Sequence, residues 1–272
     1  GRSKELENMV NLIEARPTTL MVPGIAGIGK TTMAAKVIES FTHQRNLLYH
    51  RCQDWEGSRA FLETCAEWLS AIGSNDLTDY LSSTAVPQSN IAVNLIESGL
   101  SDSPSLIVID DLHKVGDETL YSILKQLTLK IPKLDEVGLV MFSRSFRMVV
   151  PESDSSGNIV TLVMPLQGLD ANSSKQILTA LPDMDNDRFS HIYTLSRGHP
   201  LILELIPLIR PALIPMPALL ATYNPIAISL ENIEGSVSSL STRTHEANCL
   251  IGVLTPAITG VGMFILCCEI AS

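Results

Sequence analysis

Two patterns of apolar residues alternate along the first two thirds of the chain. Short continuous apolar runs are typical of strands buried on both faces of a sheet, and they occur at residues 20–22, 47–50, 106–109, 138–142 and 159–163. Apolar residues three and four apart predict amphipathic helices over 3–15, 30–41, 57–72 and 117–131. Because strands and helices alternate, we expect an α/β fold with a parallel, doubly wound sheet of about five strands.

The connections and the end of this pattern are more polar. Residues 73–90 are rich in Ser, Asn, Asp and Thr, and we expect a surface connection there with a short helix at most. After the last strand, Asp170 is a candidate helix N-terminus, a second helix covers about 186–196, and Pro200 follows Gly198 at the start of a third. These helices predict a small helical lid over residues 169–206, following a first domain over residues 1–168.

A glycine-rich loop lies between the first strand and the second helix. Gly24 to Thr31 match G-x-x-x-x-G-K-(S/T) without a mismatch, in the strand–loop–helix context that the motif requires. Glycines let successive N–H groups converge on one anion, and the following helix adds the positive end of its dipole. The first domain is therefore predicted to bind a nucleotide, with Lys30 on the β- and γ-phosphates and the Thr31 hydroxyl on Mg²⁺. The predicted nucleotide-binding residues of the loop are Gly24, Gly27, Ile28, Gly29, Lys30, Thr31 and Thr32.

Polar side chains follow two other predicted strands. Asp110 and Asp111 end the apolar run 106–109, which places two carboxylates at the sheet edge where ligands bind in α/β folds. We predict that Asp110 holds Mg²⁺ through water and that Asp111 orients or deprotonates the attacking water; a solvated turn after a strand is the alternative. Arg144 follows the run 138–142 and is predicted to contact a γ-phosphate, although an ordinary surface arginine has the same pattern.

Composition narrows the class of protein. A net charge of −10 argues against wrapping nucleic acid by bulk charge. The five cysteines form no C-x-x-C pair, so we expect neither a disulfide framework nor a zinc site, and a cytoplasmic location. The chain begins with Gly1 rather than methionine, which leads us to expect further residues upstream.

Several motifs together resemble the STAND class of P-loop NTPases, the signal-transduction ATPases and GTPases with numerous domains, which lie near the AAA+ group. Gly1 to Leu6 are similar to the G-R-x-x-E-L start of that family's nucleotide domain, and Gly24 to Thr32 are similar to its Walker A loop. Leu106 to Asp111 are similar to its Walker B strand, Ser143-Arg144 to its sensor arginine, and Gly198-His199-Pro200 to the G-x-P signature of its lid.

The resemblance implies a sheet of the ASCE type and a regulatory switch that binds Mg²⁺ with ATP or ADP and hydrolyses ATP slowly. It implies that Arg2 lies near the adenine, that Arg144 reads the γ-phosphate, and that Pro200 packs by the base in the ADP form. It also implies protein partners or further domains outside this chain, ATP-dependent self-association, and nucleic-acid contact only through other domains. The preference for ATP over GTP rests on the resemblance, since no guanine-specifying N-K-x-D is present.

The last part of the chain, residues 207–272, departs from this family. Four prolines between residues 207 and 217 disfavour helix, and only six charged residues occur from Leu205 onward. Residues 247–268 carry no charge and are long enough to cross a bilayer, but their Pro and Gly content and the lack of basic flanks argue against it. A membrane helix, buried or irregular packing, and an atypical or disrupted terminus remain open for this apolar tail.

Three other functions fit parts of the pattern. An AAA+-type initiator or remodelling ATPase would act on DNA or protein and need a basic DNA-facing wing, which the sequence does not indicate. A small-molecule kinase would need an arginine-rich lid, but residues 170–200 offer only Arg188 and Arg197. A module that holds ADP without turnover would not require the acid pair.

Overall fold

The computed structural model describes residues 1–144, 161–179 and 184–206. Five strands form one parallel sheet in the order β2-β3-β4-β1-β5. Their bounds are Thr18–Pro23 (β1), Asn46–Arg51 (β2), Ser105–Asp110 (β3), Val137–Ser143 (β4) and Thr161–Val163 (β5). The predicted parallel α/β fold of the ASCE type is therefore confirmed, with β2 and β5 at the two edges.

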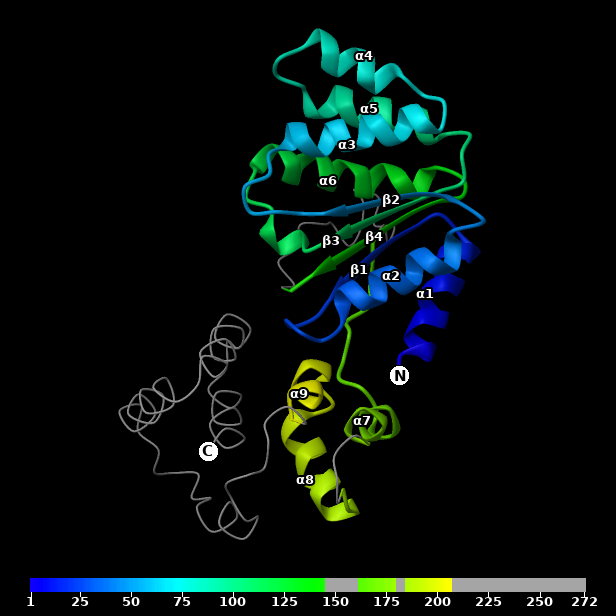
Figure 1. Cartoon of the computed structure of the whole chain (residues 1–272). Helices are drawn as coiled ribbons and strands as arrows, with labels where there is room; N and C mark the ends of the chain where they lie inside the picture. Colours follow the sequence, from blue (N-terminus) through cyan, green and yellow to red (C-terminus); the bar gives the residue numbers. More distant parts are fainter. Residues whose placement is uncertain (145–160, 180–183, 207–272) are drawn as a thin grey trace, which may run out of the picture. The chain divides into compact units, whose positions relative to one another are not determined.

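Helices cover both faces of the sheet (Figure 1). The helices α1 (Ser3–Ala15) and α2 (Lys30–Phe41) lie on one face, where α2 contacts β3 and β4. On the other face lie α3 (Ser58–Ala71), α5 (Ser89–Leu100) and α6 (Glu118–Lys130), with α4 (Asp76–Ser83) outermost. Two short 3₁₀ helices, η1 (Leu112–Lys114) and η2 (Ile131–Lys133), flank α6.

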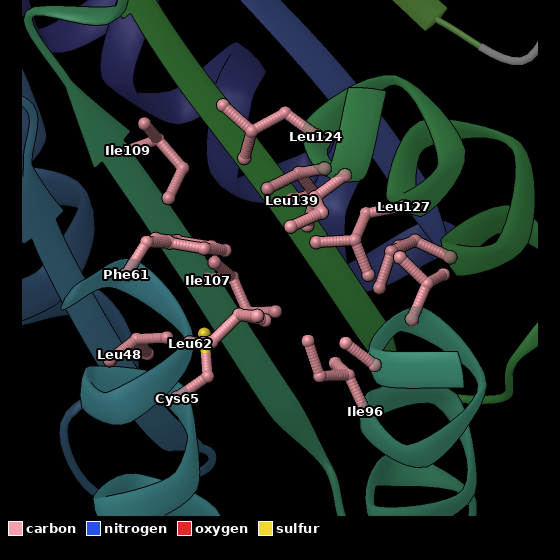
Figure 2. Packing of buried hydrophobic residues seen from close by; sticks show 14 of the residues in the cluster. Leu48, Phe61, Leu62, Cys65, Ile96, Ile107, Ile109, Leu124, Leu127 and Leu139 are labelled. Carbon is pink, nitrogen blue, oxygen red and sulfur yellow. The ribbon is translucent and has the colours of Figure 1, made fainter. Parts of the chain in front are cut away.

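The main hydrophobic core lies between the sheet and the second group of helices (Figure 2). Phe61 of α3, Ile107 of β3 and Leu139 of β4 are almost completely buried in it. Every residue of β1, β3 and β4 is buried, as expected for central strands covered on both faces. This packing fixes the strands whose C-terminal ends carry the predicted site.

The region between β2 and β3 differs from the prediction. The short helix expected within residues 73–90 is α4, but α5 was not predicted at all. Its buried residues Ala92, Val93, Ile96 and Leu100 recur at helical spacing. The preceding run of Ser, Asn, Asp and Thr obscured this signal, and α5 packs against α3 and α6 in the folded chain.

The chain divides into two compact units, each described here by itself. One comprises Arg2–Ile25 and Gly29–Gln167 and contains the sheet; the other comprises Gly1, Ala26–Ile28 and the chain from Gly168 onward. The second unit contains α7 (Ala171–Leu178), α8 (Asn186–Ser196) and α9 (Pro200–Leu205), close to the three helices that the sequence predicts. The division into domains at residue 168 stays a prediction.

Side-chain caps begin each of the described helices of the second unit. Asp170, Asp185 and His199 accept hydrogen bonds from the first turns of α7, α8 and α9. Gly198 has a φ of +71°, and a Cβ there would lie 2.1 Å from the carbonyl oxygen of Leu169. The glycine of the predicted G-x-P signature thus allows a close backbone approach at the start of α9.

Some predictions fall on residues that the structure does not describe. The first two residues of the strand expected at 159–163, the prolines from residue 207 onward and the apolar run 247–268 all lie outside the described residues. Within the described ranges, every helix is too short or too polar to cross a membrane.

Candidate functional site

The loop between β1 and α2 has the backbone geometry of a phosphate-binding loop. Gly27 and Gly29 have φ values of +72° and +98°, which L side chains rarely adopt. Gly29 is also the N-cap of α2, so the unpaired N–H groups of the helix begin directly after it. These features form a concave set of main-chain donors, which is suited to an anion such as phosphate.

The Lys30 ammonium lies inside this loop. Its Nζ donates hydrogen bonds to the carbonyl oxygens of Gly24 (2.7 Å) and Ile25 (3.0 Å). Burial and the nearby charge of Arg144 lower the pKa of Lys30 to about 8, although Asp111 and Asp110 oppose the shift. A cation that is partly desolvated and held against the loop is suited to bind a polyphosphate.

Asp110, the last residue of β3, is completely buried and lies next to the loop. Its Oδ2 accepts hydrogen bonds from the hydroxyl groups of Thr31 (2.7 Å) and Tyr49 (3.3 Å), and its Oδ1 accepts one from the N–H of Asp111 (2.8 Å). Thr31 and Asp110 are 79 residues apart in sequence, and the sheet brings them together. A hydroxyl beside a buried carboxylate is a set of hard oxygen donors, which fits Mg²⁺ completed by water and phosphate oxygens.

Asp111 adopts a left-handed backbone conformation (φ +55°), unusual for a residue with a side chain. Its Oδ2 pairs with Arg51 at 2.9 Å and with Lys114 at 3.4 Å. Burial opposes ionisation of this carboxyl group, but the hydrogen bond from Arg51 and the charges of Lys114 and Arg51 outweigh it and lower the pKa of Asp111. Asp111 is therefore ionised at neutral pH but held by two cations.

Arg144 directly follows β4, which lies between β1 and β3 in the sheet. The side chain is exposed, and its charge acts on Lys30 and on His113. The structure thus brings the charges of Lys30, Asp110, Asp111 and Arg144 into mutual range at the C-terminal edge of the sheet. Thr32 lies exposed in the first turn of α2.

Arg2 lies close to Gly29 of the loop. Its guanidinium donates to the carbonyl oxygen of Gln167 (2.7 Å) and pairs with Glu5 (3.3 Å), and a Cβ on Gly29 would lie 3.7 Å from its Nε. Burial lowers the pKa of Arg2, against the opposing charge of Glu5. These contacts tie the start of α1 to the chain beyond β5; the role of Arg2 near an adenine stays a prediction.

Residues 14–145 match the family model described as AAA domain. That match contains the glycine-rich loop, the acid pair and Arg144. Residues 14–145 therefore resemble an AAA domain.

Solved structures are similar in fold. A signal-transduction ATPase with numerous domains and a tetratricopeptide-repeat sensor, from Pyrococcus horikoshii, is 22% identical with a TM-score of 0.57. That comparison covers 97% of this chain but only 38% of the archaeal protein. The Orc1 protein of Aeropyrum pernix, solved in complex with DNA, is 16% identical with a TM-score of 0.48, over 99% of this chain and 81% of that one. No curated protein is significantly similar in sequence.

The matched region contains site residues that sequence reasoning missed. Tyr49 and Arg51 of β2 reach Asp110 and Asp111, and they could have been suspected because the strand holding them ends beside the acid-bearing strand. Burial and the neighbouring Asp110 carboxylate raise the pKa of Tyr49, so its hydroxyl keeps its proton and donates.

His113, two residues after Asp111, is a third such residue. Its buried Nδ1 has no hydrogen-bond partner among the described residues. Burial and the charge of Arg144 lower its pKa, which favours the neutral imidazole.

Pro200 begins α9 in the second unit, which also contains the loop tip Ala26–Ile28. In that unit the Nε2 of His199 lies 2.8 Å from the carbonyl oxygen of Ala26, and its Nδ1 accepts from Ile202 N–H. The tautomer that satisfies both contacts carries its hydrogen on Nε2. A Cβ on Gly27 would lie 2.8 Å from His199 and Leu201, a second reason for glycine at this position. The role of Pro200 beside a base stays a prediction.

Proposed function

We propose that this chain is the nucleotide-dependent switch of a STAND-type protein, which binds ATP with Mg²⁺ and hydrolyses it slowly. The observation that carries the proposal is the meeting of the Thr31 hydroxyl with the buried Asp110 carboxylate beside Lys30. That arrangement joins a phosphate-binding loop to a hard-oxygen metal site.

Each charged residue has one role in the proposed reaction. Lys30 leaves the loop carbonyls and binds oxygens of the β- and γ-phosphates, and Arg144 neutralises charge on the γ-phosphate. Thr31 and Asp110 would hold Mg²⁺, which would supply positive charge that stabilises the negative charge of the phosphates. Asp111 orients the attacking water and accepts its proton.

Slow turnover follows from the pairing of Asp111. A carboxylate that already accepts a hydrogen bond from Arg51 and forms an ion pair with Lys114 is a weak base toward water. A protein with such a site stays in its ATP form for long periods, which suits a switch more than a metabolic enzyme.

The STAND assignment is supported by the motifs from Gly1-Arg2 to Gly198-His199-Pro200 and by the fold of the Pyrococcus horikoshii protein. Since this chain spans 38% of that protein, the signal, effector and self-association of a complete switch would reside largely in other parts. We infer that ATP and ADP bind with different affinity to two arrangements of the chain, because a ligand shifts an equilibrium only through such a difference.

Nucleotide binding and hydrolysis by two variants test the proposal. Lys30→Ala should abolish binding of ATP with Mg²⁺, whereas Asp111→Asn should keep the affinity and lower turnover by about 10²-fold or more. Calorimetric binding and phosphate release, with ATP and GTP and with or without DNA, measure both. Unchanged ATP affinity in Lys30→Ala would exclude the loop as the phosphate site, and turnover that requires DNA would favour an initiator ATPase.

A further inference from the structure

The edge strand β2 has buried side chains on one face and exposed side chains on the other. Leu48 and His50 are buried toward the main core, while the alternate residues Tyr49 and Arg51 are exposed on the opposite face. Arg51 lies beside Asp110 in the parallel pairing with β3. Tyr49 is only partly buried, since 42% of its surface remains exposed.

The hydroxyl of Tyr49 nevertheless reaches the buried carboxylate of Asp110. It donates to Oδ2 at 3.3 Å, the same oxygen to which the Thr31 hydroxyl donates at 2.7 Å. Oδ1 is held by the N–H of Asp111. Tyr49 is thus a third donor to a carboxylate with no exposed surface.

We propose that Tyr49 is a positioning residue of the magnesium site, acting through Asp110. This inference rests on the proposed function, because it assigns Asp110 to the metal. The terminal torsion of an aspartate is broad, so the plane of the carboxylate is set by its hydrogen-bond partners. A metal-ligating carboxylate that is itself hydrogen-bonded holds its metal more tightly.

The role of Tyr49 differs from that of Thr31. The Thr31 hydroxyl has lone pairs that can bind the metal while its hydrogen is donated to Asp110. Tyr49 is not proposed as a metal ligand; it donates a hydrogen bond to the same oxygen of Asp110 as Thr31 does. Its removal should therefore change metal affinity while leaving the contacts of the loop with phosphate intact.

Tyr49→Phe removes the hydroxyl and keeps the ring. We expect the variant to bind a non-hydrolysable ATP analogue in EDTA as the wild type does. The Mg²⁺ midpoint, which is the Mg²⁺ concentration that gives half of the metal-dependent gain in affinity, should rise about tenfold. This is the lower end of the range for losing a hydrogen-bond partner of a metal ligand, because a contact of 3.3 Å is long. Calorimetric titration at a series of Mg²⁺ concentrations measures this, and Mn²⁺ binding by electron paramagnetic resonance repeats it without hydrolysis.

Tyr80→Phe is the matched control. Its hydroxyl accepts a hydrogen bond from the N–H of Gln88 at 2.8 Å, in α4 on the outer layer of helices. Losing this hydroxyl should lower stability slightly and leave the Mg²⁺ dependence unchanged. An equal Mg²⁺ shift in both variants would show a general effect on the fold and overturn the inference.

A double variant tests whether Tyr49 acts through Asp110. If it does, adding Tyr49→Phe to Asp110→Ala should not shift the Mg²⁺ midpoint further, because the hydrogen-bond acceptor is already absent. Additive shifts, or equal Mg²⁺ dependence of Tyr49→Phe and wild type, would exclude the positioning role of Tyr49. Neither outcome would exclude the proposed function. A wild-type chain that binds no nucleotide at any Mg²⁺ concentration would remove the proposed function as well.

Discussion

Arg51 donates a hydrogen bond from Nε to Oδ2 of Asp111 at 2.9 Å, and its Nη2 forms an ion pair with the same oxygen at 2.9 Å. The arginine side chain is half exposed, whereas that of Asp111 is almost buried. An ion pair with one exposed partner is worth about 1 kcal/mol or less, so it can be opened at little cost. The residue predicted to activate water is therefore held by a contact that can be reversed.

Removing the Arg51 cation should raise turnover. We expect Arg51→Met to increase the rate of ATP hydrolysis about three- to tenfold at unchanged ATP affinity, because Asp111 becomes a stronger base while Lys114 still pairs with it. Single-turnover phosphate release measures the rate. Arg59→Met, which removes an exposed pair with Glu63, is the control and should have no effect.

The opposite result is also informative. A lower rate in Arg51→Met would mean that the arginine orients Asp111 for catalysis and would contradict the prediction. The double variant Arg51→Met/Asp111→Asn should be no faster than Asp111→Asn, because the gain requires the carboxylate.

The affinity for ATP should depend on pH through Lys30. Its pKa of about 8 means that the ammonium loses its proton as the pH rises above 8, and a neutral amine no longer attracts phosphate. We expect affinity with Mg²⁺ to fall by up to about tenfold per pH unit above pH 8. Lys30→Arg, whose guanidinium stays charged, should bind with an affinity that is constant between pH 7.5 and 9.5. A wild-type affinity that stays constant over this range would contradict the lowered pKa.

The lowered pKa of Lys30 also makes stability depend on pH, in the opposite direction to the affinity for ATP. An unfolded lysine keeps its proton up to about pH 10.4, whereas folded Lys30 loses it near pH 8. Between these values the unfolded chain binds one more proton, so the contribution of Lys30 to the free energy of unfolding rises with pH. Urea unfolding should therefore show that the free energy of unfolding of the wild type rises relative to that of Lys30→Met from pH 8 to pH 10.

Local patterns in the sequence predict much of this fold. The helices at 3–15, 30–41 and 186–196 have the predicted bounds, because capping, periodicity and breakers are properties of neighbouring residues. The loop at Gly24–Thr31 and the pair Asp110-Asp111 are also predictable, because each consists of residues that are contiguous in the sequence. The partners of the acids are not contiguous, since Tyr49 and Arg51 reach them only through the pairing of β2 with β3. That pairing, and the packing that stabilises α5, depend on the whole sheet.

The core between the sheet and α3, α5 and α6 should account for most of the stability. Leu139 of β4 is completely buried there (Figure 2), and Leu139→Ala should lower the free energy of unfolding by about 2–5 kcal/mol. Val86→Ala, at a side chain that is 81% exposed, should change it by less than about 0.5 kcal/mol. Urea denaturation measures both, and equal midpoints for the two variants would contradict the assignment of this core.

A comparison of two glycines with similar backbone conformations can distinguish the effect of backbone strain from an effect on phosphate binding. Gly29 and Gly73 have φ values of +98° and +105°, and a Cβ at either position meets nothing closer than 3.7 Å. Alanine at each position should therefore cost a similar 1–3 kcal/mol of stability, from backbone strain alone. Only Gly29→Ala should also weaken ATP binding, by at least about tenfold, because the strain shifts the N–H groups at the start of α2. Thermal unfolding with and without an ATP analogue tests this: the ligand should stabilise Gly73→Ala as it does the wild type. Equal stabilisation of Gly29→Ala would show that this part of the loop does not bind phosphate.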